Sequence, residues 1–471
     1  MPSNSIDSVS IDNVSIDNVS IDNVSIDNVS IDNVRGLYSV GSHTIDVTPP
    51  VGVYLAGYGG RHTPSDGVYH PLRAVSTVID DGQGPLLLVS FEWLGFYDRT
   101  AEARRRIAAA TGIAPDRMVL SGTHTHCGPV MRQNMDLRRH GTIDEDYIDR
   151  VLDDLAQSAR EALDRAEPAR LRVGTSWCGF ASSRRRPDGP GRVLYKPSLD
   201  APHDHEVTVV VVESPEGDLR QMLFSYACHP ISAGALTQIG GDFAAYACDF
   251  LEDTYGGAKA GFFQGCAGDQ KPDTRAADGD GWRNLELDEV RALGHQLGKA
   301  VQRVVDTDDL RPIDGPITAT QSVLSLRTDP ADRGALEACA RSSAEYEREW
   351  AAHHLKLAER GEEARREFDF EVQTIRFGES LLIVTLSGEM SVEYALRCKR
   401  TWGGRFDGIL VLGYTNDIVG YVPVRRQIPE GGYEVINNNR HQLYTGPFAE
   451  ETEELILAAI DQAVASPSIK E

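Results

Sequence analysis

Hydrophobic runs and amphipathic segments alternate along most of the chain, from about residue 38 to residue 465. The β-branched runs RAVSTVIDD and PLLLVSFEW are separated by a Gly-rich turn and predict a β-hairpin within residues 73–93. A second hairpin is predicted where FEVQTIRFG is followed by SLLIVTLSGE. Apolar residues at helical spacing predict helices at 99–111 and 144–165.

The same two patterns continue through the rest of the sequence. They predict strands near 117–122, 170–178, 206–214, 220–230, 260–269 and 408–416, and helices near 243–255, 285–305, 330–368, 392–400 and 450–465. Alternating strands and helices favour a mixed α/β fold in which helices flank central sheets. No clear linker separates Tyr38 from Ala465, so we expect one large catalytic domain over residues 37–471.

The N-terminal segment has a different character. Residues 5–34 are six copies of a five-residue unit, SIDSV once and SIDNV five times. A segment this short buries too little apolar surface to fold alone, because repeat units need stacked neighbours. We therefore expect residues 1–36 to be a disordered tail that carries no chemistry.

The composition argues against several classes of partner. The chain has 47 Lys and Arg against 71 Asp and Glu, a formal charge of −24. Such a surface repels phosphate backbones and anionic lipid heads, so neither nucleic acid nor a membrane is an expected partner.

The sequence shows no transmembrane stretch and no secretory signal. Its seven cysteines are odd in number and lack a C-x-x-C pair, which indicates reduced thiols in a cytoplasmic protein. We expect a small-molecule substrate, and no pattern indicates an oligomeric state.

Candidate chemistry follows three of the apolar runs. Ser121-Gly-Thr-His124-Thr-His126-Cys-Gly-Pro129 follows the first, and two histidines at i and i+2 on extended backbone would face the same side. His229 lies in ACHP, directly after the apolar run LFSY. Glu389 lies in SGE, directly after the apolar run LLIVTL. Taken singly, each of these residues is more often an ordinary buried side chain than a ligand.

The combination is more informative than its parts. Ligand sites in α/β proteins lie outside the carboxyl ends of the strands, where all three groups fall. Two histidines and one glutamate with an open position are a typical catalytic zinc set. Zinc lowers the pKa of bound water toward about 7 and polarises a carbonyl group. The residues alone therefore indicate a zinc site built from His124, His229 and Glu389.

Several stretches of the chain resemble the neutral/alkaline non-lysosomal ceramidases, in their N-terminal catalytic domain. They are IDVTPPVGVYLAGYGGR, SGTHTHCGP, FSYACHPIS, FFQGCAGDQKPD, SGEMS and GYTNDIVGY…GGYE, in this order. SGTHTHCGP is the most specific of them. The resemblance runs from about Ile45 to Arg440, nearly the whole predicted domain.

The resemblance implies a mechanism and a set of residues. In that family one zinc ion is held by two histidines, a glutamate and a tyrosine, which correspond here to His124, His229, Glu389 and Tyr421. It further implies that His126 and Tyr433 lie at the scissile amide and stabilise the developing oxyanion. An arginine that lines the family's site is best matched by Arg185. The expected reaction is hydrolysis of a linear N-acyl amide bond by zinc-activated water.

The chain also departs from the family pattern. Lys271 stands where the ceramidases carry a serine that has been proposed as a nucleophile, so a serine acyl-enzyme is not expected. Lys271 is instead a candidate clamp for a substrate carboxylate, and Asp269 a candidate group for positioning the water. The sequence shows neither the family's C-terminal immunoglobulin-like domain nor a secretion signal. We therefore expect the family's fold and zinc chemistry but a substrate other than ceramide.

Three alternatives remain open from the sequence. A biosynthetic zinc enzyme would use the same site for acyl transfer or for closing a ring. A cysteine nucleophile is conceivable because Cys127, Cys228 and Cys266 fall inside the resembling motifs. A binding protein on a decayed hydrolase fold would show neither metal nor activity. Metal analysis and thiol alkylation distinguish these alternatives from the zinc hydrolase.

Overall fold

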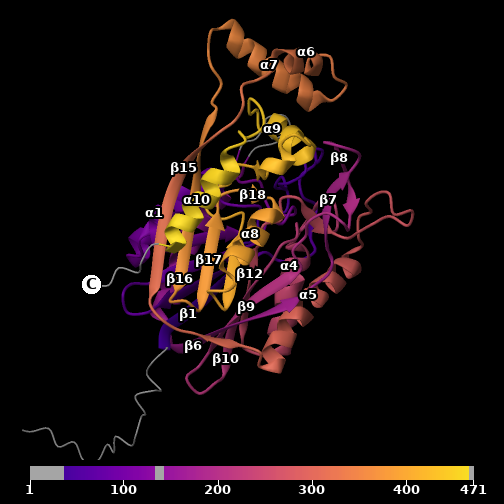
Figure 1. The fold of residues 1–471 in the computed structure, drawn as a ribbon. Helices are drawn as coiled ribbons and strands as arrows, with labels where there is room; N and C mark the ends of the chain where they lie inside the picture. The colour runs from indigo at the N-terminus through magenta and orange to yellow at the C-terminus, as the bar shows by residue number, and fades with distance from the viewer. Residues whose placement is uncertain (1–36, 133–142, 466–471) are drawn as a thin grey trace, which may run out of the picture. The chain divides into compact units, whose positions relative to one another are not determined.

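The computed structural model describes residues 37–132 and 143–465 (Figure 1). The predicted tail, residues 1–36, lies outside the described residues. Residues Gly36–Glu471 form one compact unit. Within the described part, no helix is long and apolar enough to cross a membrane.

The larger sheet of the described part has nine strands. Eight of them run in the order β12 (Lys259–Gln264), β10 (Leu219–Tyr226), β9 (Glu206–Glu213), β6 (Glu167–Trp177), β1 (Leu37–Asp46), β3 (Arg73–Asp80), β4 (Leu86–Phe91) and β5 (Met118–Gly122), and β14 (Arg311–Ile313) pairs with β6. Strands β3 and β4 form the predicted antiparallel hairpin, with Ala74 opposite Phe91. The β4–β5 and β10–β12 pairs are parallel.

A second sheet of four strands follows later in the chain. Its order is β15 (Ile317–Arg327), β16 (Glu367–Phe377), β17 (Leu381–Leu386) and β19 (Gly408–Leu412). Strands β16 and β17 form the other predicted hairpin, and β17 pairs in parallel with β19. Apolar side chains of both sheets, such as Leu88 and Val210 from the first and Ile383 and Leu410 from the second, share one buried core. The two sheets therefore pack face to face.

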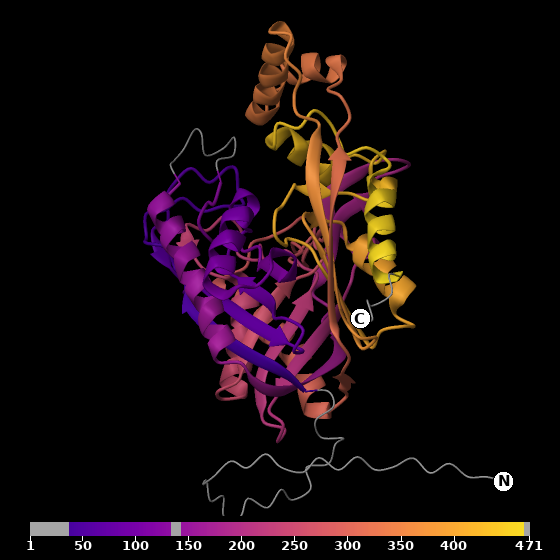
Figure 2. The same ribbon diagram turned by 90° about the vertical axis from the view of Figure 1, so that its left-hand side faces the viewer.

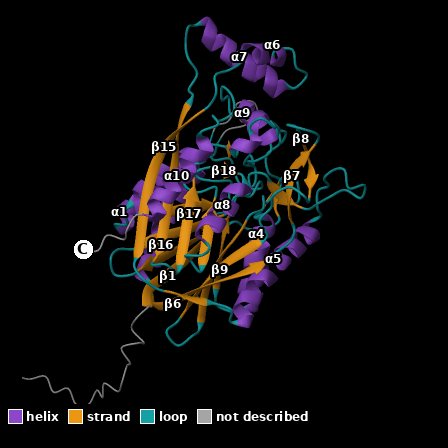
Figure 3. Ribbon diagram, viewed as in Figure 1, coloured by secondary structure: helices purple, strands orange, loops and turns teal. Residues whose placement is uncertain are grey.

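Helices cover the outer face of each sheet (Figures 2 and 3). The nine-stranded sheet packs against α1 (Thr100–Thr111), α3 (Glu145–Asp164), α4 (Asp242–Thr254) and α5 (Leu287–Thr307). The four-stranded sheet packs against α8 (Val392–Trp402) and α10 (Thr452–Ala465). The order of layers is helix, sheet, sheet, helix. This confirms the predicted mixed α/β class with flanking helices.

Shorter elements surround the ends of the two sheets. A three-stranded sheet joins β13 (Gln270–Pro272), β7 (Ala181–Pro187) and β8 (Val193–Ser198), and two-stranded pairs join β11 (Gln238–Ile239) to β2 (Gly67–Val68) and β18 (Glu389–Met390) to β20 (Tyr421–Val422). The single-turn elements are η2 (Tyr97–Arg99), η3 (Pro115–Arg117), η4 (Arg425–Gln427), η5 (Tyr433–Asn437) and α9 (Asn438–His441). The charged stretch 330–368 contains two helices, α6 (Arg333–Cys339) and α7 (Glu345–Glu359), inserted between β15 and β16.

Backbone contacts tie the two sheets together where β5, β12 and β19 end. Ser121 forms an antiparallel bridge with Thr415, and Gly265 forms one with Leu412. The Gly268 N–H also donates to the Met390 carbonyl, at 2.7 Å. The loops that follow the strands of both sheets are thereby brought to one place.

Candidate metal centre

Four side chains from four separate loops meet at this junction. His124 follows β5, His229 follows β10, Glu389 begins β18 and Tyr421 begins β20. The parallel β18–β20 pair sets Glu389 beside Tyr421, and the Glu389 N–H donates to the Gly420 carbonyl at 2.8 Å. All four side chains are buried. Residues nearly 300 positions apart in the sequence therefore form one cluster.

The distances within the cluster are those of a metal coordination shell. Oε2 of Glu389 lies 3.3 Å from Nε2 of His124 and 3.2 Å from Nε2 of His229. The Tyr421 hydroxyl lies 3.3 Å from Nε2 of His229. Ligand atoms about 2.0–2.1 Å from a tetrahedral zinc ion lie about 3.4 Å from one another. These side chains therefore fit around a single ion of that size.

Backbone carbonyls fix the orientation of both histidines. Nδ1 of His124 donates to the Leu94 carbonyl at 2.7 Å, and Nδ1 of His229 donates to the Ala267 carbonyl at 2.6 Å. A proton on Nδ1 leaves the lone pair on Nε2, the atom that faces Glu389. Ligand histidines in metalloproteins are commonly held in this way. The structure thus presents Nε2 of both rings in the form that binds a cation.

The charge states of the cluster also suit a cation. Burial, together with the charge of Arg184, lowers the pKa of His229 to about 4. Burial alone would raise the pKa of Glu389, but His124 and His229 outweigh it and bring that pKa well below its usual range. A neutral imidazole, as at His229, and an ionised carboxylate, as at Glu389, are the forms that coordinate metals.

His126 lies beside the cluster, although not for the reason expected from the sequence. The prediction of extended backbone through THTH is wrong, because β5 ends at Gly122 and His124 has a φ of +67°. This left-handed conformation is uncommon for a residue other than glycine and marks local strain. The His124 and His126 rings are 5.0 Å apart, and with His229 they form a buried group that could hold a metal ion.

The His126 ring differs from the His124 and His229 rings, because no backbone carbonyl holds it through a hydrogen bond. Neither of its ring nitrogens has a hydrogen-bond partner among the described residues. Burial, reinforced by His124 and His229, lowers its pKa well below the usual range, so the ring is neutral. The Arg61 guanidinium donates twice to the His126 carbonyl, at 2.9 Å each, and holds this loop in place. The imidazole is therefore positioned through its backbone and left free for a ligand.

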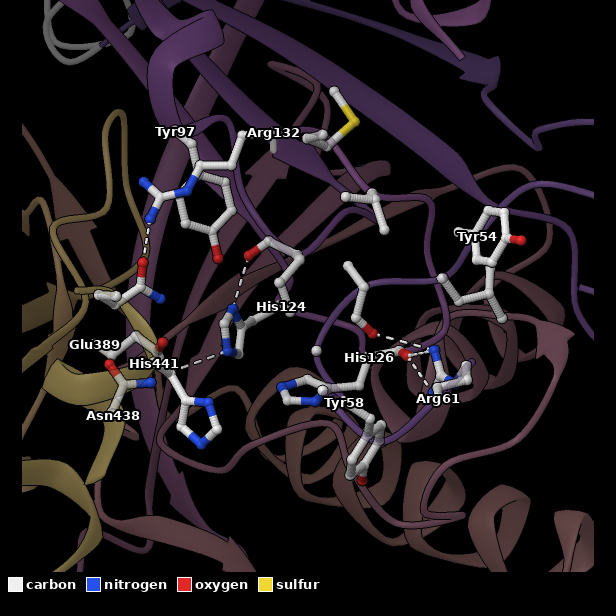
Figure 4. Close-up of a pocket in the computed structure, with 18 of the residues that line it drawn as sticks. Tyr54, Tyr58, Arg61, Tyr97, His124, His126, Arg132, Glu389, Asn438 and His441 are labelled. Atoms are coloured by element: carbon white, nitrogen blue, oxygen red, sulfur yellow. Dashed lines mark hydrogen bonds and ion pairs between the residues drawn. The ribbon is translucent and has the colours of Figure 1, made fainter. Parts of the chain in front are cut away.

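A pocket opens onto the cluster (Figure 4). His124, His126 and Glu389 lie in its wall. The wall is rich in tyrosines: Tyr54, Tyr58, Tyr97, Tyr421 and Tyr433. Tyr433 packs edge-on to Tyr421, with 5.5 Å between the ring centroids. Burial raises the pKa of Tyr433, so its hydroxyl keeps its proton and remains a hydrogen-bond donor. Tyr433 thus lines the pocket beside Tyr421, and its role at the scissile amide stays a prediction.

Arg184, next to the predicted Arg185, makes the contacts with the site tyrosines. Its guanidinium lies 5.1 Å from the centroid of the Tyr421 ring and 5.3 Å from that of Tyr433. Arg185 is also buried, but it donates to Glu434, Glu430 and the Gly431 carbonyl. Arg184 donates to Glu434 as well, at 2.8 Å, and neither arginine is in the pocket wall. Adjacent arginines could not be told apart from the sequence, because the register of this strand is irregular between Ser183 and Arg185.

Asp269 and Lys271 both lie outside the pocket wall. The Asp269 carboxylate is buried and accepts hydrogen bonds from Gln270, Ser391, Val392 N–H and Gln427. These contacts anchor the start of α8, three residues after Glu389, so the geometry favours a positioning role. Nζ of Lys271 lies 4.2 Å from the centroid of the Trp282 ring, and burial, with the charge of Arg184, lowers its pKa to about 8. Their predicted roles toward substrate and water remain predictions.

The cysteines of the motifs are unsuited to nucleophilic catalysis. All seven cysteines are buried. Burial raises the pKa of the Cys127 thiol to about 12 and those of Cys228 and Cys266 well above their usual range. The nucleophilic thiolate would therefore be scarce at neutral pH. This finding argues against the cysteine alternative.

Comparison with known proteins defines the relationship of this chain. The sequence model of the N-terminal part of the neutral/alkaline non-lysosomal ceramidases matches residues 38–289, more than half of the chain. The chain belongs to this ceramidase family. No curated protein matches the chain as a whole or in part. The match confirms the predicted resemblance, and family membership supports a hydrolase that acts on amide bonds.

Two solved structures share the fold. The crystal structure of neutral ceramidase from Pseudomonas aeruginosa has a TM-score of 0.70 at 19% identity, covering 91% of this chain and 74% of that one. A ceramidase complexed with C2 has a TM-score of 0.69 at 17% identity, covering 92% of this chain and 77% of that one. At these identities the comparison establishes the ceramidase fold.

The ceramidase-family match covers only part of the site. His124, His126 and His229 fall within residues 38–289, whereas Glu389, Tyr421 and Tyr433 lie beyond them. Gly57, Arg61, Tyr97 and Arg132 line the pocket, and Arg184 contacts its tyrosines, yet none of these residues was predicted from the sequence. The Gly-rich stretch around Gly57 was a signal for a close approach, since glycines mark backbone that must pass near another group. The arginines and Tyr97 gave no comparable signal.

Gly57 offers a test of how closely the loop packs on His126. A Cβ atom at Gly57 would lie 2.3 Å from Nδ1 of His126, and its φ of +93° already disfavours any other residue. We expect Gly57→Ala to displace the His126 ring and to lower kcat on the order of 10²-fold, since misplacement by about 1 Å costs that much. Gly52→Ala is the matched control, because Gly52 has a φ of +108° but no atom within 4 Å of an added Cβ. Equal kcat in both variants would show that the contact with His126 is unimportant.

Proposed function

We propose that this protein is a zinc-dependent hydrolase that cleaves a linear amide bond of a small molecule. The observation that carries the proposal is that Glu389 Oε2 lies 3.2–3.3 Å from Nε2 of His124 and His229, with the Tyr421 hydroxyl 3.3 Å from Nε2 of His229. His124, His229, Glu389 and Tyr421 are the proposed ligands. A bound zinc ion would supply an activated water and polarise the amide carbonyl.

The assignment of the third histidine follows from its contacts. His124 and His229 each use Nδ1 to donate to a carbonyl, whereas both nitrogens of His126 are without a partner among the described residues. A ring without a fixed tautomer is suited to exchanging a hydrogen bond with the reacting group. We therefore assign His126 to the substrate and not to the metal.

Tyr433 is the second proposed donor to the reacting carbonyl. Its retained proton can stabilise the negative charge that develops on the carbonyl oxygen, and loss of one such donor costs about 10²–10³ in rate. Arg184 orients both Tyr421 and Tyr433 by lying over their rings. Arg184 is thus a positioning residue.

Metal analysis joined to a substrate screen tests the proposal. The purified full-length chain should contain about one zinc per chain by mass spectrometry, in keeping with a single site of four ligands. It should also release free amine from at least one member of a panel of N-acyl amino acids, N-acyl amines and short ceramides. A chelator should abolish the release, and zinc should restore it. A protein that binds no zinc after reconstitution, or is equally active without it, contradicts the proposal. Formation of a transferred or cyclised product in place of free acid and amine would favour the biosynthetic alternative.

A further inference from the structure

One cation in the pocket is not used by the proposed hydrolysis. Arg132 lies in the wall of the same pocket as His124 and Glu389, and it also lines a second pocket that adjoins the first. Figure 4 shows it next to Tyr97 in this wall. Its guanidinium lies 4.8 Å from the centroid of the Tyr97 ring.

Among the described residues, Arg132 has no ion-pair partner, and its hydrogen-bond partners are neutral. Its terminal nitrogen donates to the side-chain oxygen of Gln442, which is neutral, as is the Tyr97 ring. Arg132 forms no ion pair with any carboxylate in residues 37–132 and 143–465. Asp417 lines the adjoining pocket, and burial raises its pKa while the charge of Arg132 opposes that rise, but the two form no ion pair. Tyr444, which is neutral, also shares a hydrogen bond with Arg132.

The rest of the pocket does not supply the missing negative charge. Among the described residues of its wall, Glu389 is the only acidic side chain, and its carboxylate faces His124 and His229. Arg61 is the other arginine of the wall, and its guanidinium is engaged with the carbonyls of Ala56 and His126. The Arg61 guanidinium is thus held by backbone carbonyls, whereas the described hydrogen-bond partners of Arg132 are side chains, in a protein whose overall charge is −24.

We infer that Arg132 binds a carboxylate on the substrate, so that the enzyme selects amides bearing a negative charge. The inference rests on the proposed function and names its substrate class. A guanidinium presents paired donors that match both oxygens of a carboxylate, and such charge-assisted bonds are about twice as strong as neutral ones. Because the acidic protein surface repels anions, a cation inside the pocket is needed to offset this repulsion and bind an anionic substrate.

Binding of matched ligand pairs tests the inference without requiring turnover. The probes are N-acetyl amino acids, each paired with its neutral carboxamide, and N-succinyl amines paired with N-succinamoyl amines. The two sets place the carboxylate on either side of the amide. Zinc-loaded enzyme should bind at least one carboxylate about 10- to 100-fold more tightly than its carboxamide by calorimetry. Equal dissociation constants across the whole panel overturn the inference.

Two variants identify the residue responsible for the preference. Arg132→Gln should remove the preference by weakening carboxylate binding while leaving carboxamide binding and zinc content unchanged, and Arg132→Lys should retain part of it. Arg105→Gln is the control for net charge, since Arg105 is exposed on α1 and pairs with Glu102. A preference that persists in Arg132→Gln would place the carboxylate on the metal and overturn the inference. Absence of hydrolysis with the binding preference intact would instead contradict the proposed function alone.

Discussion

Replacing Glu389 with alanine is expected to remove the metal and the hydrolytic activity together. Oε2 of Glu389 is the atom that lies 3.2–3.3 Å from both histidine Nε2 atoms, so its loss deletes the one negatively charged ligand of the proposed set. The metal contributes several kcal/mol to stabilising the transition state, and each 1.36 kcal/mol is a factor of ten. We therefore expect kcat/KM to fall by about 10³-fold or more, together with loss of zinc measured by mass spectrometry.

Two further variants make this result specific. Glu389→Gln keeps the size of the side chain but removes its charge, and it should also bind zinc weakly. Glu379→Ala is the matched control, because Glu379 lies at the turn before β17, is exposed and pairs only with Arg405 at 3.1 Å among the described residues. A Glu389→Ala protein that is active and free of zinc would refute the proposed metal mechanism.

Replacing Asp269 with alanine is expected to cause a large loss of stability. Its buried carboxylate accepts bonds from Ser391 at 2.9 Å, Val392 N–H at 3.0 Å and Gln427 at 2.8 Å, besides that from its neighbour Gln270. Removing a buried charged acceptor leaves several donors without partners, each worth about 1–3 kcal/mol. We expect the free energy of unfolding to fall by roughly 3 kcal/mol or more, measured by urea denaturation.

A comparison with another helix cap separates this effect from ordinary capping. Asp332 caps α6 by accepting the Ala335 N–H at 2.7 Å, but it is exposed. Asp332→Ala should therefore cost only about 1 kcal/mol, the usual value for such a cap. Asp269→Asn retains one acceptor and should lie between the two. If Asp269→Ala leaves stability unchanged but abolishes turnover with zinc bound, the predicted role at the water is correct and the positioning role is not.

The elements of the fold were largely predictable because their signals are local. The β3–β4 and β16–β17 hairpins follow from two apolar runs around a turn, and helices such as α1 follow from periodic apolar residues. The helical nature of 330–368 was only partly predicted: α6 and α7 are helical, but residues 360–366 are not, and β16 already begins at Glu367. The face-to-face packing of two sheets was not evident, because the strands of both have similar buried patterns.

The site was predictable only in part, for an equally physical reason. Sequence motifs marked polar residues just beyond the ends of strands, which placed His124, His229 and Glu389 in one hypothesis. The identity of the arginine that contacts the tyrosines depends on how β7 is oriented, and adjacent residues of a strand face opposite sides. A local pattern cannot decide between Arg184 and Arg185. The same holds for Arg132, whose proposed role depends on its place in the pocket wall and on the lack of an ion-pair partner in the described part of the chain.

The sequence by itself determined the α/β class, the family and the short motifs that supply the proposed ligands, since these depend on local periodicity and on residue type. Only the tertiary structure decided that Glu389 and Tyr421 lie side by side through the β18–β20 pair, that His124 takes a left-handed backbone, and that Asp269 anchors α8. These features depend on contacts between loops far apart in the chain. Such contacts form only when the two sheets pack together, and no segment of the sequence contains both partners.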